Sequence, residues 1–323
     1  MALVKYWGKR DTGLMLPKNG SISMTTDGLF AHTTVEFNPS FKEDKFIFNG
    51  LLQDTTTDAY KEYVGFFLGL VRKMTKNKDK VKISSNNNFP TAAGLASSAA
   101  GFAALAAAVN GALGLGLNEK ELSMLARRGS GSATRSISGG FVEWKRGEKE
   151  DGTDSYGEQI VPPDYWQDFR MLFCITSLKE KKVKSRAGMS QTLKTSPMYP
   201  GWLSTVGEDL NKVRQGIKDR NFTVVGRTAE ENCLKMHSTM ITTKPSIIYW
   251  KPETVKLMHA VMDWRDDGLE SYFTMDAGPQ VKIMCLEKDL EEIKGRVQKL
   301  GITEEIIVSK PGSGVKLTGE HLF

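Results

Sequence analysis

The segment Phe89-Pro-Thr-Ala-Ala-Gly-Leu-Ala-Ser-Ser-Ala-Ala-Gly101 decides the fold of this chain. Residues 81–85 before it alternate apolar and polar side chains, as a half-buried strand does, and an alanine-rich helix is predicted over residues 95–110, closed by Gly111. A strand, a turn of small residues and a helix N-terminus form an anion site, because the first N–H groups of a helix have no partner within it. A tightly packed core helix fits the same composition equally well, so the rest of the sequence must decide.

Length and composition indicate a globular protein with two domains. The 323 residues exceed the usual size of a single core, and 40% hydrophobic with 25% charged residues is ordinary for a globular chain. No apolar run approaches the length of a membrane span, and no signal peptide precedes the first strand. The three cysteines lie far apart in apolar or amphipathic segments, which predicts reduced, buried thiols of a cytoplasmic protein and no zinc site.

The basic character of the chain suits either nucleic acid or a small polyanionic substrate. The net charge is +6 and the pI is about 9.0. The positive charges cluster over residues 72–82 and 179–184, without interleaved aromatic side chains. A nucleic-acid partner is therefore not favoured.

The pattern of elements predicts an α+β protein. In the first half, strands are expected over residues 30–37 and 46–48, with a hairpin turn at Asn49-Gly50, and helices over 58–74 and 119–128. Asn118 and Glu121 form the capping box of the latter helix. The second half combines predicted helices with strands, which suggests a ferredoxin-like sandwich; we expect the domains to span residues 1–180 and 181–323. The further predicted elements are strands at 141–144, 169–176, 272–275, 281–285 and 305–309 and helices at 203–217, 225–236 and 290–300.

Two segments of the first half combine cations with donors that could bind an anion. In Lys5-Tyr-Trp-Gly-Lys9, two lysines flank two aromatic residues, and both lysines cannot be buried without anionic partners. A solvated edge strand is the alternative. In residues 127–136, Ser130, Ser132 and Arg135 lie in a glycine-containing loop, where hydroxyls and a two-pronged guanidinium suit a carboxylate or phosphate better than a plain loop does.

Two segments of the second half complete the set. Ser185-Arg-Ala-Gly-Met189 repeats the combination of hydroxyl, cation and glycine, and Met275-Asp-Ala-Gly-Pro279 places one carboxylate in a turn, where Asp often serves only to form the turn. The histidines are isolated and predict neither a metal cluster nor a Ser–His–Asp triad. Together the segments suggest one site, with cations and hydroxyls to hold phosphates and one carboxylate to move a proton.

These segments, in order from Ala2 to about Val308, resemble mevalonate diphosphate decarboxylases of the shorter bacterial form. The glycine–serine turn is shared by the wider superfamily of galactokinase, homoserine kinase, mevalonate kinase and phosphomevalonate kinase, whereas the segments around Lys5 and Asp276 are more specific. The resemblance implies an N-terminal domain like domain 2 of ribosomal protein S5, a ferredoxin-like C-terminal domain, a site between them and a homodimer. It also implies that ATP and Mg²⁺ are used to convert (R)-mevalonate 5-diphosphate to isopentenyl diphosphate, through transient phosphorylation of the 3-hydroxyl.

The resemblance also implies roles for individual residues. Asp276 would be the general base at the 3-hydroxyl, Arg135 would hold the substrate carboxylate, and Lys5 would complete the catalytic set. Ser98 would contact Mg²⁺. The substrate pocket would be lined by Tyr6, Trp7, Lys9, Ser130, Gly131, Ser132, Ser185, Arg186 and Met189, and the ATP phosphates would be bound by Pro90, Ala92, Ala93, Gly94, Leu95, Ala96, Ser97 and Ser98.

The chain departs from the family at several positions. Thr134 stands where a cysteine is common and Gly20 where a serine is usual, and family members carry further residues before the segment that matches Ala2. The tail after Ser309 fits the family poorly and is expected to carry no chemistry.

Two alternatives remain open at this point. The first keeps the fold and changes the reaction: a decarboxylase of mevalonate 5-phosphate or 3,5-bisphosphate, or a kinase that stops at the 3-phosphate. The second is an RNA-binding module, which would show a basic face with exposed aromatic residues and steeply salt-dependent binding.

Overall fold

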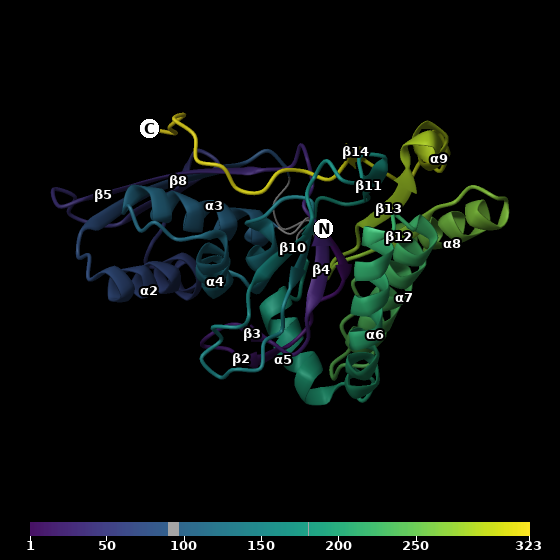
Figure 1. The fold of residues 1–323 in the computed structure, drawn as a ribbon, viewed down its shortest axis with the longest axis horizontal. Helices are drawn as coiled ribbons and strands as arrows, with labels where there is room; N and C mark the ends of the chain where they lie inside the picture. The colour runs from purple at the N-terminus through teal and green to yellow at the C-terminus, as the bar shows by residue number, and fades with distance from the viewer. Residues whose placement is uncertain (90–96, 180) are drawn as a thin grey trace.

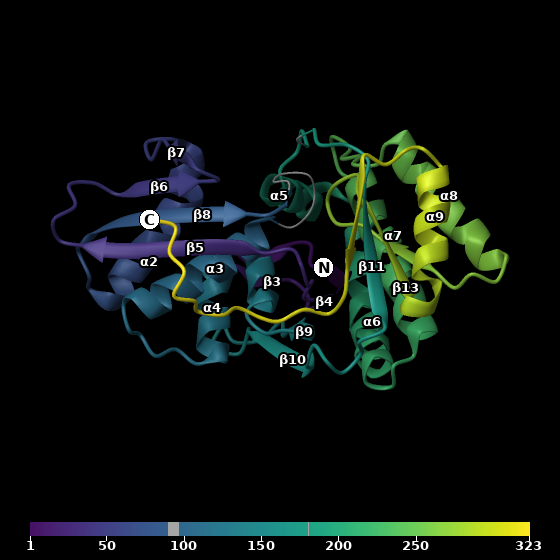
Figure 2. The same ribbon diagram turned by 90° about the horizontal axis from the view of Figure 1, so that it is seen from above.

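The computed structural model describes residues 1–89, 97–179 and 181–323, whose strands form three four-stranded sheets and one two-stranded sheet. The sheet that contains β4 lies between the helices and sheet of the N-terminal part and those of the C-terminal part (Figures 1 and 2). This mixed arrangement confirms an α and β architecture. Among the described helices, none has both the length and the hydropathy needed to cross a membrane.

Two of the four-stranded sheets come from the first half of the chain. The outer sheet has the strand order β5-β8-β6-β7 and the inner sheet β1-β4-β9-β10. The hairpin predicted at Asn49 and Gly50 joins β6 to β7, and both residues have positive φ, as a two-residue hairpin turn requires. The strand bounds are β1 (Ala2–Val4), β2 (Lys9–Asp11), β3 (Leu16–Pro17), β4 (Ser21–Met24), β5 (Ala31–Asn38), β6 (Lys45–Phe48), β7 (Leu51–Gln53), β8 (Lys80–Asn87), β9 (Phe141–Trp144) and β10 (Gly157–Val161).

The helices of the first half begin largely where the sequence predicts. The capping box of Asn118 and Glu121 is formed at the start of α4. The helix expected to close at Gly111 instead continues to Ala112. The left-handed glycine that follows the helix is Gly114, with φ 57°. The bounds are α1 (Asp58–Tyr60), the π-helical η1 (Lys61–Gly65), α2 (Phe66–Thr75), α3 (Ser97–Ala112), α4 (Glu119–Gly129) and the 3₁₀ segment η2 (Gly131–Ser136).

The third sheet is antiparallel and has the order β12-β13-β11-β14. Its strands are β11 (Phe169–Ile175), β12 (Tyr272–Thr274), β13 (Val281–Leu286) and β14 (Glu305–Ser309). Because β11 precedes residue 180, the range expected for the N-terminal domain includes a strand that hydrogen bonds to the C-terminal sheet.

The helices of the second half include two that the sequence pattern did not predict, α5 and α8. Both start after a lysine. In α8, Leu257, Ala260, Val261 and Trp264 follow helical spacing, but the exposed Val255 and Met262 place apolar side chains on the opposite face and weaken the pattern. The bounds are α5 (Ser185–Thr195), α6 (Tyr199–Lys218), α7 (Phe222–Ile241), α8 (Pro252–Asp266), the 3₁₀ segment η3 (Glu287–Asp289) and α9 (Leu290–Lys299).

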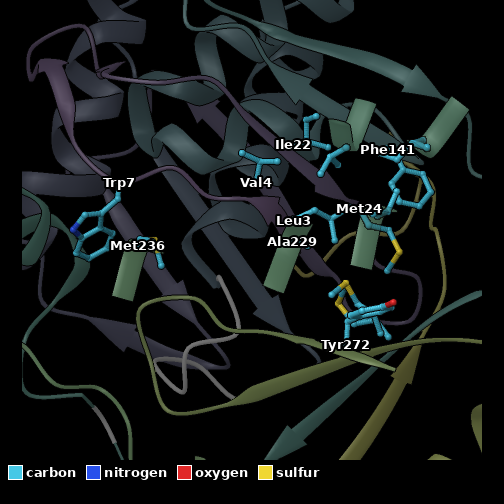
Figure 3. Close-up of a cluster of buried hydrophobic side chains, with 14 of the residues drawn as sticks. Leu3, Val4, Trp7, Ile22, Met24, Phe141, Ala229, Met236 and Tyr272 are labelled. Atoms are coloured by element: carbon cyan, nitrogen blue, oxygen red, sulfur yellow. The ribbon is translucent and has the colours of Figure 1, made fainter. Parts of the chain in front are cut away.

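One continuous core joins the inner sheet to the C-terminal helices. Leu3 of β1 and Ile22 of β4 are fully buried and belong to the same cluster as Ala229 of α7 and Tyr272 of β12 (Figure 3). Helix α7 therefore lies between the inner sheet and the C-terminal sheet and contacts both. This packing fixes the inner sheet relative to β12, and the ends of β1 and β12 lead into the site.

The contact of α7 with β12 depends on a glycine. A Cβ added at Gly226 would overlap the buried ring of Tyr272. We expect Gly226→Ala to lower the free energy of unfolding by about 1–3 kcal/mol through overpacking. Gly207→Ala in α6 is the matched control, since an added Cβ there meets no atom within 4 Å; it should be neutral or stabilising by up to ~1 kcal/mol. Chemical denaturation measures both, and equal destabilisation in the two variants would contradict the prediction.

Candidate active site

One cavity gathers the segments that the sequence singled out. It has a volume of about 840 Å³ and is lined by residues from both halves of the chain. Every predicted site residue within the described residues contributes to the lining: Lys5, Tyr6, Trp7, Lys9, Ser97, Ser98, Ser130, Gly131, Ser132, Arg135, Ser185, Arg186, Met189 and Asp276. The predicted phosphate-binding residues Pro90, Ala92, Ala93, Gly94, Leu95 and Ala96 lie outside the described residues.

The segment from Lys5 to Lys9 reaches the cavity between β1 and β2, and its turn requires a glycine. Gly8 has φ 107°, and a Cβ there would overlap the hydroxyl of Tyr199. That hydroxyl donates a hydrogen bond to the Trp7 carbonyl at 2.7 Å. The Trp7 ring is buried on the same side as Met236 of α7 (Figure 3), so the aromatic residue anchors the turn in the core.

Lys5 is buried and ion-paired, so the solvated edge strand is wrong for this residue. Its side chain is 1% exposed, and Nζ lies 3.0 Å from Oδ1 of Asp276 and donates to the carbonyl of Ala2 at 2.8 Å. Its backbone N–H donates to Asn232, and its carbonyl accepts from Asn19. Both the charge and the backbone of this lysine are therefore fixed.

Asp276 carries the carboxylate that faces these cations. It follows β12 in a turn closed by a hydrogen bond from the Gly278 N–H to its carbonyl at 2.7 Å. Burial opposes its ionisation, but the positive charges of Lys5 and Lys282 and the hydrogen bond from Lys5 hold the pKa of the carboxyl well below its usual range. Because a quarter of the side chain is still exposed, this ionised carboxylate is accessible from the cavity.

Three serine hydroxyls form a row along one side of the cavity. Ser98 Oγ of α3 lies 3.3 Å from Ser130 Oγ, which lies 3.2 Å from Ser132 Oγ. Ser130 is the residue between α4 and η2, so the row joins the first turn of α3 to the loop that carries Arg135. Adjacent hydroxyls can donate to the oxygens of a phosphate or of water bound to a cation.

Two buried residues at the cavity carry hydrogen-bond donors without a partner among the described residues. In the part of the chain that the structure describes, neither the Tyr6 hydroxyl nor Nε of Arg135 has a hydrogen-bond partner. The guanidinium of Arg135 donates instead through Nη1 to the Ser21 hydroxyl. Burial lowers the pKa of Arg135 to about 10, while the charge of Asp276 counteracts it. Unsatisfied buried donors are costly in an empty pocket and favour an anionic ligand.

Lys9 and Arg186 extend the positive lining away from Asp276. Arg186 stacks on the ring of Tyr63 at 3.9 Å and donates to the carbonyls of Glu62 and Gly129. Partial burial, and to a lesser degree the charge of Arg186, lower the pKa of Lys9 to about 8. The two cations thus lie near enough to interact electrostatically.

Several residues of the site were missed by the sequence reasoning. Lys181 lines the cavity and donates to the Ser185 hydroxyl and the Ala277 carbonyl; its place in the basic stretch 179–184 was the available signal. Lys282 in β13 is fully buried. Burial lowers the pKa of Lys282 to about 8, and the negative charge of Asp276 opposes this shift. Asn232 lies on the buried face of an amphipathic helix, where no pattern distinguishes it.

The C-terminal tail, expected to carry no chemistry, lines the same cavity. After β14 it returns to the N-terminal part, where Pro311 forms a bridge with Thr26 and the Val315 N–H donates to Ile137 (Figure 2). Residues 313–316 together with Thr318 and Glu320 contribute to the lining. The tail is therefore a wall of the site.

The donor set around the cavity fits a cation that is bound mainly through phosphates. Within residues 1–89, 97–179 and 181–323, no three His, Cys, Asp or Glu side chains are grouped to hold a metal ion. Mg²⁺ typically keeps several waters and takes few protein ligands beside substrate phosphates. The Ser98 hydroxyl, in the first turn of α3 and at the cavity, is compatible with such a contact.

Comparison with known proteins identifies the family. The profile of the diphosphomevalonate decarboxylase-like N-terminal domain matches residues 1–157, and that of the mevalonate 5-diphosphate decarboxylase C-terminal domain matches residues 171–314. The human diphosphomevalonate decarboxylase is 36% identical over 312 residues, which are 92% of this chain and 77% of the human protein. The chain belongs to the diphosphomevalonate decarboxylase family.

Solved structures of this family share the whole fold. A decarboxylase from Enterococcus faecalis is 42% identical with a TM-score of 0.90, covering 97% of this chain and 94% of that chain. The Staphylococcus aureus enzyme is 40% identical with a TM-score of 0.91 and the same coverage. MDDEF in complex with MVAPP, AMPPCP and magnesium is 43% identical with a TM-score of 0.91, covering 98% of this chain and 96% of that chain.

The lowered pKa of Asp276 predicts a pH-dependent contribution to stability. At neutral pH, Asp276→Asn leaves Lys5 and Lys282 facing each other without the carboxylate, so we expect a lower free energy of unfolding. The native carboxyl stays ionised below the unfolded pKa of about 3.9, so the advantage of Asp276 should decline as the pH falls below about 4, by up to ~1.4 kcal/mol per pH unit.

Denaturant unfolding at pH 7, 5 and 3.5 measures this difference. The exposed residue Asp263 provides the control Asp263→Asn. A difference between native protein and Asp276→Asn that grows as the pH falls from 5 to 3.5 would contradict the prediction.

Proposed function

We propose that this chain catalyses the ATP-dependent decarboxylation of (R)-mevalonate 5-diphosphate to isopentenyl diphosphate, with release of ADP, phosphate and CO₂. The observation that carries the proposal is the ionised carboxylate of Asp276, ion-paired to Lys5 at 3.0 Å in a cavity whose lining holds more basic than acidic side chains, together with several hydroxyls. Such a lining suits a substrate with several negative charges and one proton to give up. The relatives named as diphosphomevalonate decarboxylases support the same reaction.

ATP and Mg²⁺ would be held at the serine row. Ser97 and Ser98 begin α3, whose first N–H groups have no partner within the helix and suit phosphate oxygens. When bound, Mg²⁺ neutralises charge on the phosphates and so assists phosphoryl transfer. Ser130 and Ser132 extend the donors toward the substrate side of the cavity.

Asp276 would accept the proton of the substrate's 3-hydroxyl. A tertiary alcohol is a poor acid, so a positioned base contributes about 10²–10⁴ in rate. Arg135 would bind the substrate carboxylate through guanidinium nitrogens other than Nη1, which already donates to Ser21. Lys5 would keep Asp276 ionised before the substrate enters.

The remaining residues of the cavity would bind the diphosphate and the mevalonate carbons. The Tyr6 hydroxyl, Lys9, Ser185 and Arg186 supply donors and positive charge for the diphosphate. The less polar lining is expected from Trp7, Gly131 and Met189.

The proposal extends to the domains. The C-terminal sheet reads 4-1-3-2 when its strands are numbered along the chain from β11, and two helical connections join its strands as in a ferredoxin-like fold. This order supports a ferredoxin-like C-terminal domain that begins between Val161 and Phe169, instead of at residue 181. The N-terminal domain is proposed to be like domain 2 of ribosomal protein S5, on the resemblance alone.

Assembly and location are likewise proposals. The resemblance supports a homodimer, which sedimentation would test. The buried free thiols of Cys174, Cys233 and Cys285 support a cytoplasmic location.

Alternative reactions of the same fold are less favoured. Relatives that are 34–37% identical over more than nine-tenths of this chain are named for the diphosphate substrate. An enzyme for the 3,5-bisphosphate would not need phosphoryl transfer, and a 3-kinase would not need the full set of Lys5, Arg135 and Asp276. RNA binding has no support from the aromatic residues, which pack mainly in the core.

The proposed reaction is tested by its products. Purified protein receives ATP, magnesium and carboxyl-labelled (R)-mevalonate 5-diphosphate, and ADP and CO₂ are measured together. Equal amounts of both are expected. ADP without CO₂ would indicate a 3-kinase, and neither product would redirect the search to the monophosphate and the 3,5-bisphosphate.

Replacing the proposed base should affect turnover more than binding. We expect Asp276→Asn to lower kcat by at least ~10²-fold, because the amide cannot accept the proton. Substrate affinity, measured by calorimetry, should be retained because the cations and hydroxyls of the cavity remain. Near-native turnover of a folded Asp276→Asn protein would remove Asp276 from this role.

The lowered pKa of Lys9 predicts weaker capture of substrate above pH 8. As Lys9 loses its proton, the cavity loses positive charge, so kcat/KM should fall on the basic side near pH 8. Lys9→Arg should move this basic limb to higher pH, because a guanidinium keeps its charge. The exposed Lys149→Arg is the control. An unmoved limb in Lys9→Arg would assign the titration to another group.

A further inference from the structure

Helix α7 holds both partners of the ion pair through two consecutive residues. The Asn232 side-chain carbonyl accepts from the backbone N–H of Lys5 at 2.8 Å. The neighbouring Cys233 thiol accepts from the N–H of Met275 at 3.1 Å, next to Asp276. Lys5 and Asp276 are 271 positions apart in the chain, yet one turn of a single helix fixes the backbone beside each of them.

The orientation of the Asn232 amide is determined by its partners. The N–H of Lys5 is only a donor and the Asp209 carboxylate only an acceptor, so the carbonyl must face Lys5 and the NH₂ must face Asp209. The NH₂ donates to Oδ2 of Asp209 at 2.7 Å, and the same oxygen accepts from Lys235 Nζ at 2.6 Å. Asn232 is fully buried and Asp209 nearly so, which makes each bond costly to lose.

The opposite side of the Lys5 backbone is held as well. Asn19, also buried, donates to the Lys5 carbonyl at 2.7 Å. Two asparagines therefore clamp the peptide groups before and after the Lys5 side chain, from α7 and from the loop that follows β3. The Lys5 side chain therefore extends toward Asp276 from a backbone that is hydrogen bonded on both sides.

We propose that Asn232, oriented by Asp209 and Lys235, is a positioning residue that sets the Lys5 ammonium against the Asp276 carboxylate. This proposal rests on the proposed function, in which Asp276 takes a proton from the substrate. Asn232 does not line the cavity and acts only through Lys5. A displacement of about 1 Å at a reacting group can cost on the order of 10²-fold in rate, so a lost clamp has consequences far larger than one hydrogen bond.

The test uses Asn232→Leu, which removes both bonds at nearly constant volume. We expect kcat to fall about 10–10²-fold with a smaller change in KM, because the cavity that binds substrate is kept. Thr239→Val is the matched control: this buried threonine of α7 donates only to Met236 in its own helix. It should leave kcat within about threefold of the native value.

A second readout needs no substrate. Carbon-13 NMR of labelled aspartate follows the titration of the Asp276 carboxyl, assigned with Asp276→Asn. In Asn232→Leu the titration should move to higher pH, since Lys5 no longer sits close to the carboxyl. The other titratable or charged groups facing Asp276 are unchanged in this variant: the amino group of Met1, Arg135, Cys233, His237 and Lys282.

The outcomes separate the inference from the function on which it rests. If native protein yields no products, the proposed function fails, and the carboxyl titration alone decides the role of Asn232. If Asn232→Leu does not fold, Asn232→Ser replaces it and should show a smaller shift in the same direction. Native-like kcat and an unshifted Asp276 titration in a folded Asn232 variant would overturn the proposal.

Discussion

The ion pair of Lys5 and Asp276 is the constraint on which the site depends. Nζ and Oδ1 lie 3.0 Å apart, and the lysine is almost completely buried. A lysine in such a place needs an anion, because the cost of leaving it unpaired is several kcal/mol. Asp276 supplies that anion, because the turn after β12 lies against the end of β1. Two segments 271 positions apart in the sequence therefore meet at one point, and both line the cavity.

The hydrophobic core makes this meeting rigid. Helix α7 packs its apolar face on Leu3 and on Tyr272, so the two strands that lead to the pair share one support (Figure 3). The polar residues of α7 then hold the backbone next to each partner. Packing of α7 brings the two strands close to each other. The buried hydrogen bonds then fix the positions of the backbone next to Lys5 and Asp276. This division explains why an amphipathic helix carries uncharged polar residues on its buried side.

The sequence predicted what periodicity and motifs encode. Strands such as β14 and helices such as α6 and α9 follow from apolar spacing, and the capping box of α4 from Asn118 and Glu121. Helices α5 and α8 were missed, α8 because apolar side chains on its exposed face obscure the helical spacing of its buried residues. The membership of β11 in the C-terminal sheet depends on long-range pairing, which no local pattern records. The same holds in the site. Lys5, Arg135 and Asp276 stand in distinctive segments and were predicted. Asn232 and Lys282 lie in ordinary core elements, and only the fold shows that they face Lys5 and Asp276.

The charge balance of the cavity links substrate binding to the chemistry of Asp276. Before substrate enters, Lys5 and Lys282 hold the pKa of the carboxyl far below neutral pH, so it is ionised but a weak base. An anionic substrate adds negative charge beside the same cations and offsets part of their field. A carboxylate in a more negative surrounding has a higher affinity for protons. In the proposed reaction, Asp276 would thus become an effective base when the anion that carries the reactive hydroxyl is bound, and it would stay a weak base in the empty site. The excess of positive charge in the free cavity would then couple recognition of the substrate to proton removal.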